Sequence, residues 1–344
     1  MGMKAVLIES HGGPEKLLYK EVSLPSIGPE EVLVRVRTCG LNHVDLFVRE
    51  GKLPVSITLP RIPGMEITGE VAETGSGVND FKKGDRVVVM SRMGCLACEY
   101  CKAGEENICA KSRSIGMNVD GGYAEFVAAP ARNLVAIPSG VSFNQAAGAS
   151  LSALTAWHML ITRAGLKRGD DVLVLAGGSS VGSFAIQIAK GHGARVFTTV
   201  GSEEKGERAM KLGADAVILH KKQDIAEEVK RLTGKRGVDI VFEHVGERTW
   251  EKSIASLARN GRLVTCGAHT GKNGNLDIWK LFSKQLSVIG AYYGTKNELA
   301  EVLRIMSEGR MSTVIHASFP LHASREAHEV LENRENFGKV ILEV

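Results

Sequence analysis

Residues 172–208 decide the fold and read VLVLAGGSSVGSFAIQIAKGHGARVFTTVGSEEKGER. The apolar run Val172–Leu175 is typical of a buried strand, and the glycine- and serine-rich stretch 177–182 after it is typical of a tight turn. A helical pattern begins at Ser183, and a β-branched run occupies Val196–Val200. The stretch therefore predicts a strand–helix–strand unit with a glycine turn before the helix.

The glycine turn favours a binding site for a dinucleotide. Backbone N–H groups at the start of a helix can approach a pyrophosphate where no bulky side chains intervene, and the helix dipole favours its charge. The window Gly177–Gly182 has glycine at both ends, but Ser179 stands where the middle glycine of the dinucleotide fingerprint is expected. A glycine-rich turn without a ligand is therefore the alternative interpretation.

The residues after the second strand favour NADP(H) over NAD(H). An NAD site usually carries an acidic residue at this point, where it accepts from the ribose 2′-OH. Here the strand ends at Val200 with no carboxylate at its tip, and Ser202, Lys205 and Arg208 follow. These three can hold a 2′-phosphate. Two glutamates between them weaken this interpretation, and a solvated helix face is the alternative.

Length and composition indicate an ordinary two-domain protein. The chain has 344 residues, of which 44% are hydrophobic and 24% charged, and its net charge is +4. The positive charge is spread out, which argues against a nucleic-acid partner. No run of 18 apolar residues suggests a membrane span, and the N-terminus lacks a signal-peptide core. We therefore expect a cytoplasmic location and no membrane partner.

The pattern along the chain changes twice. Up to about residue 150, short β-type runs alternate with turns, which suggests an antiparallel or barrel-like domain. Helical patterns then separate six apolar runs, which predicts a doubly wound parallel sheet and an α/β fold class. These strands are expected at 172–175, 196–200, 216–219, 240–243, 263–266 and 286–291. The short elements after Thr295 resemble the first domain, so we expect the chain to return to it.

Four of the six cysteines fall within fifteen residues and predict a metal site. Cys95, Cys98, Cys101 and Cys109 have the spacing C-x2-C-x2-C-x7-C, and such clustering in a cytosolic chain favours metal over disulfides. Four thiolates can surround one Zn²⁺ tetrahedrally and leave no open position, which is typical of a structural site. We therefore expect one structural zinc in a lobe at 94–110; four free thiols are the alternative.

Several short segments give the chain a resemblance to the medium-chain dehydrogenase/reductase superfamily, which includes alcohol dehydrogenases and quinone reductases. They are GDRV at 84–87, DGGYAEF at 120–126, LTAWH at 154–158 and FGKVIL at 337–342. The resemblance covers essentially the whole chain. It implies a GroES-like, β-barrel-type catalytic domain at 1–150 and 293–344 and a Rossmann domain at 151–292. It also implies hydride transfer to or from a nicotinamide, and a homodimer or homotetramer.

The chain departs from the zinc-dependent members of this family at the catalytic metal. At the three positions that match their zinc ligands it has Asn42, Met65 and Leu151. An amide and a thioether are poor zinc ligands, and an alkyl group is none. Asn42 and Asp45 instead match the N-x-x-D of zinc-free quinone reductases. The resemblance thus implies a structural zinc lobe combined with a reductase-type active site.

Family matching also assigns individual residues. Asn42 is predicted to donate to the oxyanion that develops on the substrate, with a purely structural amide as the alternative. His43 and Lys339 match positions where basic residues face the pyrophosphate. The predicted cofactor-binding residues are His43, Thr155, Ser179, Ser180, Val181, Gly201, Ser202, Lys205, Val245, Gly267, Ala268 and Lys339.

These observations predict an NADP(H)-dependent oxidoreductase that reduces a ketone, a quinone or an α,β-unsaturated carbonyl without a catalytic zinc. Such electrophilic, small hydrophobic carbonyl substrates suit a site that lacks a Lewis acid. One alternative is a zinc-dependent alcohol dehydrogenase in which His43 and Glu66 rebuild a metal site. Another is a non-catalytic NADPH-binding sensor or scaffold.

Overall fold

The computed structural model describes residues 2–344, which divide into two compact units. Unit 1 comprises Met1–Ser152 and Thr295–Val344, and unit 2 comprises Ala153–Gly294. The chain passes into unit 2 after Ser152 and returns to unit 1 after Gly294, in each case two residues later than the boundary expected from the sequence. No helix in the described part of the chain has both the length and the apolar character that a membrane span requires.

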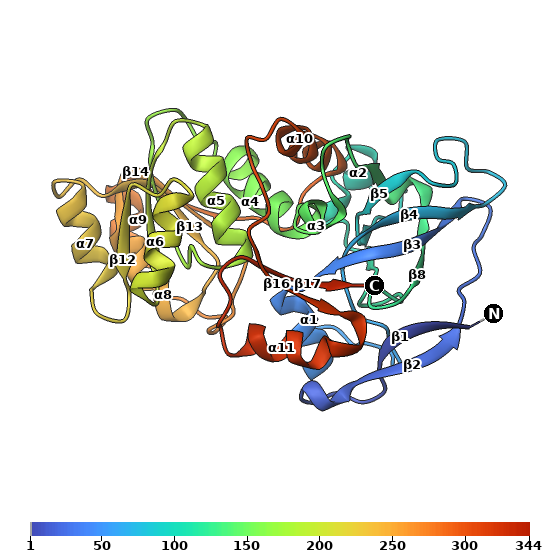
Figure 1. Cartoon of the computed structure of the whole chain (residues 1–344). Coiled ribbons are helices and arrows are strands. Elements are labelled where there is room, and N and C mark those ends of the chain that lie inside the picture. Colours follow the sequence, from blue (N-terminus) through green and yellow to red (C-terminus); the bar gives the residue numbers. More distant parts are fainter. Residues whose placement is uncertain (1) are drawn as a thin grey trace. The chain divides into compact units, whose positions relative to one another are not determined.

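Unit 1 is built on a seven-stranded sheet in which the end of the chain pairs with its beginning (Figure 1). The C-terminal strand β17 (Lys339–Glu343) runs antiparallel to β3 (Glu31–Gly40), which in turn pairs with β4 (Glu66–Thr74). Gly40 lies opposite both Glu66 and Ile341, so the ends of three strands meet at one place. The other strands of this unit are β1 (Gly2–Ile8), β2 (Leu17–Ser23), β5 (Arg86–Val89), β6 (Arg92–Met93), β7 (Arg113–Ser114), β8 (Phe126–Pro130), β9 (Leu134–Ala136) and β16 (Ile315–Pro320).

Short helices cover parts of this sheet. They are α1 (His43–Glu50), α2 (Glu99–Lys102), α3 (Phe143–Ala146), α10 (Lys296–Ser307) and α11 (Ser324–Glu332). The sequence interpretation missed α11, which buries Ala327 and Leu331 at i, i+4 spacing and packs on β16 and β17. Helix α1 begins at the residue after Asn42, whose backbone N–H donates to Asp45 Oδ2 at 2.8 Å. The N-x-x-D sequence is therefore a helix start.

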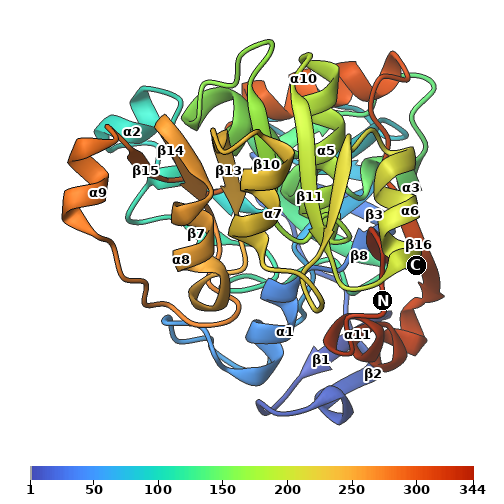
Figure 2. The ribbon, with the colours of Figure 1, turned by 90° about the vertical axis from the view of Figure 1, so that its left-hand side faces the viewer.

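Unit 2 is a six-stranded parallel sheet with the order β12-β11-β10-β13-β14-β15, which confirms the doubly wound α/β prediction. Its strands are β10 (Asp171–Val174), β11 (Arg195–Val200), β12 (Ala216–Leu219), β13 (Val238–Glu243), β14 (Leu257–Thr265) and β15 (Ser287–Gly290). Its helices are α4 (Leu154–Trp157), α5 (Ser180–Gly191), α6 (Glu203–Lys211), α7 (Ile225–Leu232), α8 (Glu247–Ala255) and α9 (Ile278–Ser283). In Figure 2, β15 and α9 lie at the same side of this sheet.

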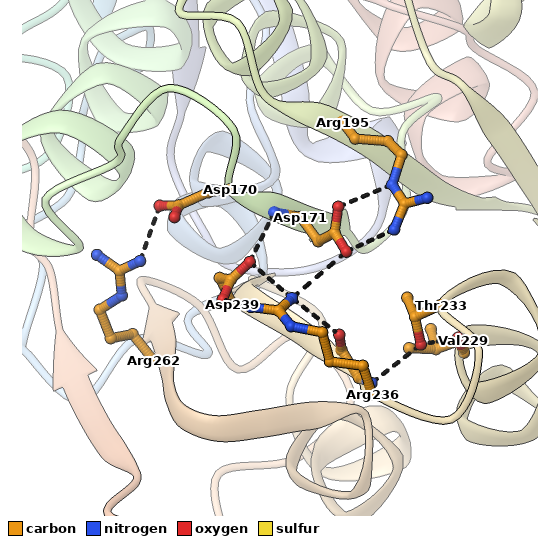
Figure 3. Close-up of polar contacts among 9 residues, drawn as sticks. Asp170, Asp171, Arg195, Val229, Thr233, Arg236, Asp239 and Arg262 are labelled. Carbon is orange, nitrogen blue, oxygen red and sulfur yellow. Dashed lines mark hydrogen bonds and ion pairs between the residues drawn. The ribbon is translucent and has the colours of Figure 1, made fainter.

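The amino edge of this sheet carries a network of ion pairs (Figure 3). The Asp171 carboxylate accepts two hydrogen bonds from Arg195, at 2.7 and 2.6 Å, and the Asp171 backbone N–H donates to Asp239 at 2.9 Å. Arg236 bonds Asp239 at 2.5 and 3.0 Å. These charged groups are paired with one another, whereas the glycine turn follows β10 at the opposite, carboxyl edge, where ligands of such sheets bind.

Candidate functional site

The glycine turn between β10 and α5 has the local geometry of a phosphate-binding helix start. The helix begins at Ser180, three residues earlier than the sequence pattern predicted, because Ser179 Oγ caps it by accepting from the Gly182 N–H at 2.9 Å. A Cβ atom at Gly182 would lie 2.4 Å from the carbonyl oxygen of Ala176, so only glycine fits there. Ser180 Oγ is buried and has no hydrogen-bond partner within residues 2–344. An unpartnered hydroxyl at a helix start fits a phosphate oxygen.

A cavity of about 300 Å³ lies at the carboxyl ends of β11 and β12. The residues that line it are Gly201, Ser202, Glu203, Leu219, Lys221 and Lys222. Ser202 caps α6 by accepting from the Lys205 N–H at 3.3 Å. Lys222 Nζ lies 2.8 Å from Glu203 Oε1, and this hydrogen bond and charge lower the pKa of Glu203. One of the two glutamates that opposed a 2′-phosphate site therefore has a cationic partner.

Sequence reasoning missed Lys221 and Lys222 because they follow a different strand from Ser202. The signal was available, however: β11 and β12 are neighbours in the sheet, so residues that follow the two strands meet at one edge. A Cβ atom at Gly201 would lie 3.5 Å from Lys221 Cε, which shows how closely the Lys221 side chain approaches the turn. Lys221 thus adds a positive charge to the predicted 2′-phosphate site, and Lys222 offsets the charge of Glu203.

Other predicted cofactor residues in unit 2 also lie beyond strand ends. Val245 follows β13 and donates its N–H to Glu243 Oε1 at 2.6 Å. Gly267 follows β14, and a Cβ atom there would lie 2.8 Å from the carbonyl oxygen of His244. The buried His244 ring bonds Leu175 O through Nε2 at 2.8 Å, and burial lowers its pKa. His244 thus ties two strand ends together. Thr155 is buried in α4, Val181 lies in the first turn of α5, and Ala268 is exposed after β14.

In unit 1, the side chain of Lys339 is buried with no exposed surface. Its Nζ lies 2.5 Å from Glu66 Oε2, 2.8 Å from Asn42 Oδ1 and 3.0 Å from Leu41 O. An ammonium group has three protons, and these three acceptors account for all of them. The Lys339 ammonium therefore points toward Glu66 within unit 1, and its predicted contact with the pyrophosphate stays a prediction. His43 is half-buried as the first residue of α1.

The Glu66 carboxylate, which faces Lys339, also has hydrogen-bond partners for both of its oxygens. Glu66 has no exposed side-chain surface, and its Oε1 accepts from the backbone N–H groups of Leu151 at 2.8 Å and Ser152 at 3.0 Å. These N–H groups belong to a π-helical segment, Ala149–Ala153. A buried ion pair is tolerated when its remaining lone pairs are hydrogen-bonded. The arrangement therefore holds one positive and one negative charge inside unit 1.

Asn42 is the half-buried member of this network. Its Oδ1 accepts from Lys339 and from Ser152 Oγ at 3.2 Å, and its Nδ2 donates to Glu66 at 2.9 Å and to Gly40 O at 3.3 Å. Both amide protons are therefore engaged, and the contact with Gly40 is longer than the usual range for an N–H···O bond. Asn42 thus makes the hydrogen bonds of a structural amide. To donate to a ligand, its Nδ2 has to give up the long contact with Gly40 O.

Asp45 and Cys39 lie beside the network and are fully buried. Burial raises the pKa of Asp45 to about 7 against the lowering effects of the Asn42 N–H and Lys339. Its Oδ1 has no hydrogen-bond partner among the described residues. Burial also raises the pKa of the Cys39 thiol, which keeps this cysteine protonated and unreactive.

The four lobe cysteines converge as their spacing predicted. Their Sγ atoms all lie within 4.8 Å of one another. Tetrahedral zinc with Zn–S bonds of about 2.3 Å places its sulfur ligands about 3.8 Å apart, so the donor set and its size fit one zinc ion. Arg92 holds the lobe through hydrogen bonds to Asn107 O at 2.8 Å and Cys109 O at 3.3 Å.

Comparisons with known proteins identify the family of the chain. The family described as "Alcohol dehydrogenase GroES-like domain" matches residues 28–139, and the family described as "Zinc-binding dehydrogenase" matches residues 180–308. An alcohol dehydrogenase of Geobacillus stearothermophilus is 34% identical, and the alignment covers 99% of this chain and 100% of that protein. A quinone oxidoreductase of Rattus norvegicus is 30% identical, with 99% and 97% covered.

A solved structure titled as an NAD-dependent alcohol dehydrogenase superposes on this chain with a TM-score of 0.95. It is 42% identical in sequence, and the match covers 99% of this chain and 100% of that one. Relatives of both dehydrogenase and quinone oxidoreductase type thus match over nearly the full length. The chain therefore belongs to the medium-chain dehydrogenase/reductase superfamily and is an oxidoreductase of the alcohol dehydrogenase and quinone oxidoreductase type.

Proposed function

We propose that the protein is an NADPH-dependent reductase of ketones, quinones or α,β-unsaturated carbonyls that works without a catalytic zinc. The observation that carries this proposal is the Lys339–Glu66–Asn42 network, in which a buried ammonium group bonds the side chain that stands at a zinc-ligand position. The cofactor supplies the hydride when it is bound. The residues of the chain bind the cofactor, hold the substrate oxygen and keep the site electrostatically balanced.

The donor chemistry at the three replaced ligand positions does not fit zinc. Asn42 offers an amide that is already engaged, Met65 is buried and offers a thioether, and Leu151 offers no ligand atom. In contrast, Cys95, Cys98, Cys101 and Cys109 fit one structural zinc, which would order the lobe. The proposal is therefore one zinc per chain.

An electrophilic carbonyl suits such a site because nothing in it replaces the strong polarisation of a metal ion. Asn42 is the half-buried polar side chain of the network, so it is the group that a ligand oxygen can approach. Its Nδ2 can exchange the long contact with Gly40 O for a hydrogen bond to the oxyanion that develops during reduction.

The choice of NADPH rests on residues of this chain, since the solved relative above is named as NAD-dependent. No carboxylate ends β11, Ser202 caps α6, and Lys221 and Lys222 line the adjoining cavity. Charge-assisted hydrogen bonds to a phosphate are the strongest that these groups can make.

Elemental analysis and turnover test the function together. Protein purified without added metal is analysed for zinc, and NADPH oxidation is followed with an enone, a quinone and an aryl ketone. One zinc per chain with turnover is expected. Two zincs per chain would contradict the proposal and favour a metal site rebuilt by His43 and Glu66. NADPH binding without turnover on the whole panel would favour the sensor or scaffold.

Two lysine variants test the cofactor. Lys205→Ala and Lys221→Ala should each weaken NADPH binding by about 1–3 kcal/mol and leave NADH binding nearly unchanged, as loss of a charge-assisted contact to the 2′-phosphate would. Lys230→Ala is the matched control, because Lys230 is exposed on α7 and pairs with Glu227. Isothermal titration calorimetry measures the affinities. Equal losses for both cofactors would remove the 2′-phosphate assignment.

We also propose that the protein forms a homodimer through the edge strand β15. This strand ends the sheet order, so one side of it has no partner strand within residues 2–344. Nearby α9 exposes Ile278, Trp279 and Phe282 at 73%, 71% and 57%. A second copy would cover both features. Light scattering should show a dimer for the wild type and a monomer for Val288→Lys/Trp279→Glu; an unchanged mass would contradict this interface.

A further inference from the structure

We propose that the Lys339 ammonium is a tethered cation bound in a three-oxygen site, and that it positions and polarises Asn42 for the reaction. The proposal rests on the proposed function for its catalytic part only. It assigns to Lys339 a role different from contact with the cofactor, and it treats Glu66, Asn42 and Leu41 as the ligands of a cation site that this chain fills from its own C-terminal strand.

The geometry around Lys339 Nζ is that of a cation site. One carboxylate oxygen, one amide oxygen and one backbone carbonyl oxygen lie at 2.5, 2.8 and 3.0 Å. Carboxylate and carbonyl oxygens are also the ligands that hard divalent cations prefer. The ammonium therefore sits among donors that would bind a metal ion if the lysine were removed.

The fold holds the lysine in this position. The backbone of β17 is fixed by pairing with β3, and the Lys339 N–H donates to Val314 O at 2.7 Å. A Cβ atom at Gly40 would lie 2.3 Å from Ala147 O and 3.3 Å from Lys339 Cδ, so a glycine is needed beside the lysine stem. The sheet thus fixes the backbone that carries the lysine, and three hydrogen bonds hold its ammonium group.

The positive charge of Lys339 acts on the half-buried Asn42 through the hydrogen bond between them. Lys339 and Ser152 both donate to Asn42 Oδ1, and hydrogen bonds to an amide oxygen polarise the amide and strengthen its N–H groups as donors. The Glu66 contact fixes one amide proton, and the other makes only the 3.3 Å contact with Gly40 O. Lys339 is thus a positioning residue that acts through Asn42.

Metal binding tests the cation site without any assay of turnover. Lys339→Ala removes the ammonium and leaves the three oxygens, and Mn²⁺ is the probe. We expect Lys339→Ala to bind one Mn²⁺ per chain beyond the wild type by electron paramagnetic resonance titration, and Glu66→Gln/Lys339→Ala to lose this binding. Lys4→Ala is the control, because Lys4 is an exposed lysine of unit 1 that pairs with Glu21. Folded Lys339→Ala protein that binds no more Mn²⁺ than the wild type would overturn the proposal.

Kinetics test the positioning role. Glu66→Gln/Lys339→Met removes both charges together, so it avoids a buried unpaired charge and keeps the proposal testable if Lys339→Ala does not fold. Its kcat should fall about 100-fold, the effect of losing one oxyanion donor, while its KM for NADPH stays within about twofold. A kcat equal to that of the wild type would show that the pair serves only the fold and would overturn the positioning role.

Failure of the proposed function can be distinguished from failure of the cation-site proposal. If the wild type turns over no substrate of the panel, the proposed function fails, and the Mn²⁺ titration still decides whether the three oxygens form a cation site. If turnover is present and Mn²⁺ raises the kcat of Lys339→Ala at least tenfold, a cation at this position is what the reaction requires. If Mn²⁺ binds without raising kcat, the catalytic part of the proposal is wrong.

Discussion

Unit 1 contains two places suited to a positive charge, and they are built in different ways. The lobe gathers four thiols from a segment of fifteen residues, in which Cys95, Cys98 and Cys101 are half-buried. The Lys339 site gathers groups from β17, β4 and the start of α1, and Lys339 and Glu66 are 273 residues apart in sequence. Four thiols close together in a short segment suit an external ion, which would fix the shape of the segment. A position at the meeting of three strands can receive its cation from the protein itself.

The largest effect is expected when the cysteine lobe loses one of its zinc ligands. Cys101→Ser removes one of four zinc ligands, and zinc binding at such sites contributes on the order of 10 kcal/mol to ordering the segment around it. Zinc content should fall toward zero, and amide hydrogens of residues 94–110 should exchange much faster, as mass spectrometry would show. Cys266→Ser is the control, because Cys266 lies outside the lobe, in the segment between β14 and α9. Retention of zinc by Cys101→Ser would mean that the lobe binds the metal differently.

A smaller effect is expected at the tethered cation. Lys339→Met leaves the Glu66 carboxylate buried without its partner, which typically costs about 3–5 kcal/mol in the free energy of unfolding. Glu66→Gln/Lys339→Met should recover most of this loss, because neither charge then remains. Chemical denaturation measures both. If the single and double variants were equally unstable, the ion pair would not be the cause, and the packing of the lysine stem would be.

A pH-dependent free energy of unfolding is expected from Asp45, which lies beside the Lys339–Glu66 pair. Burial raises the pKa of this carboxyl to about 7 in the folded state, well above its value in the unfolded chain. The folded state therefore keeps a proton that the unfolded state loses, so Asp45 makes the free energy of unfolding fall as pH rises from about 4 to 7. Asp45→Asn should gain about 2–3 kcal/mol relative to the wild type between pH 5 and pH 8.

Urea denaturation of both proteins at the two pH values checks this prediction. Only the difference between variant and wild type is diagnostic, because burial also lowers the pKa of His328 to about 3, and that shift makes stability fall as pH decreases below about 6.5. Cys39, Tyr123, Glu66 and Lys339 all influence the surroundings of Asp45 and are retained in the variant. An identical pH dependence in the two proteins would mean that Asp45 is ionised in the folded state throughout this range.

The sequence predicted features whose causes are local in the chain. The lobe cysteines lie close together in sequence, and the strands of unit 2 are short apolar runs, so both could be found by pattern. Helix α5 begins earlier than predicted because the cap is set by one hydrogen bond from Gly182 to Ser179, which apolar spacing does not reveal. Sequence patterns could not give the contacts of Lys339, because they depend on how β17 pairs with β3. The same holds for Lys221, which reaches the β11 turn only through the order of the strands.

The return of the chain to unit 1 has a consequence for synthesis on the ribosome. Unit 2 is one continuous segment and can fold as soon as residue 294 has emerged, whereas unit 1 needs both ends of the chain. Until β17 is translated, Glu66 lacks its partner Lys339, and the last residues of β3 are paired on one side only, with β4. A nascent chain that stops before residue 339 therefore carries an unpaired acidic group at an unfinished sheet. Translation of residues 339–343 therefore completes the polar network that residues 40–66 began.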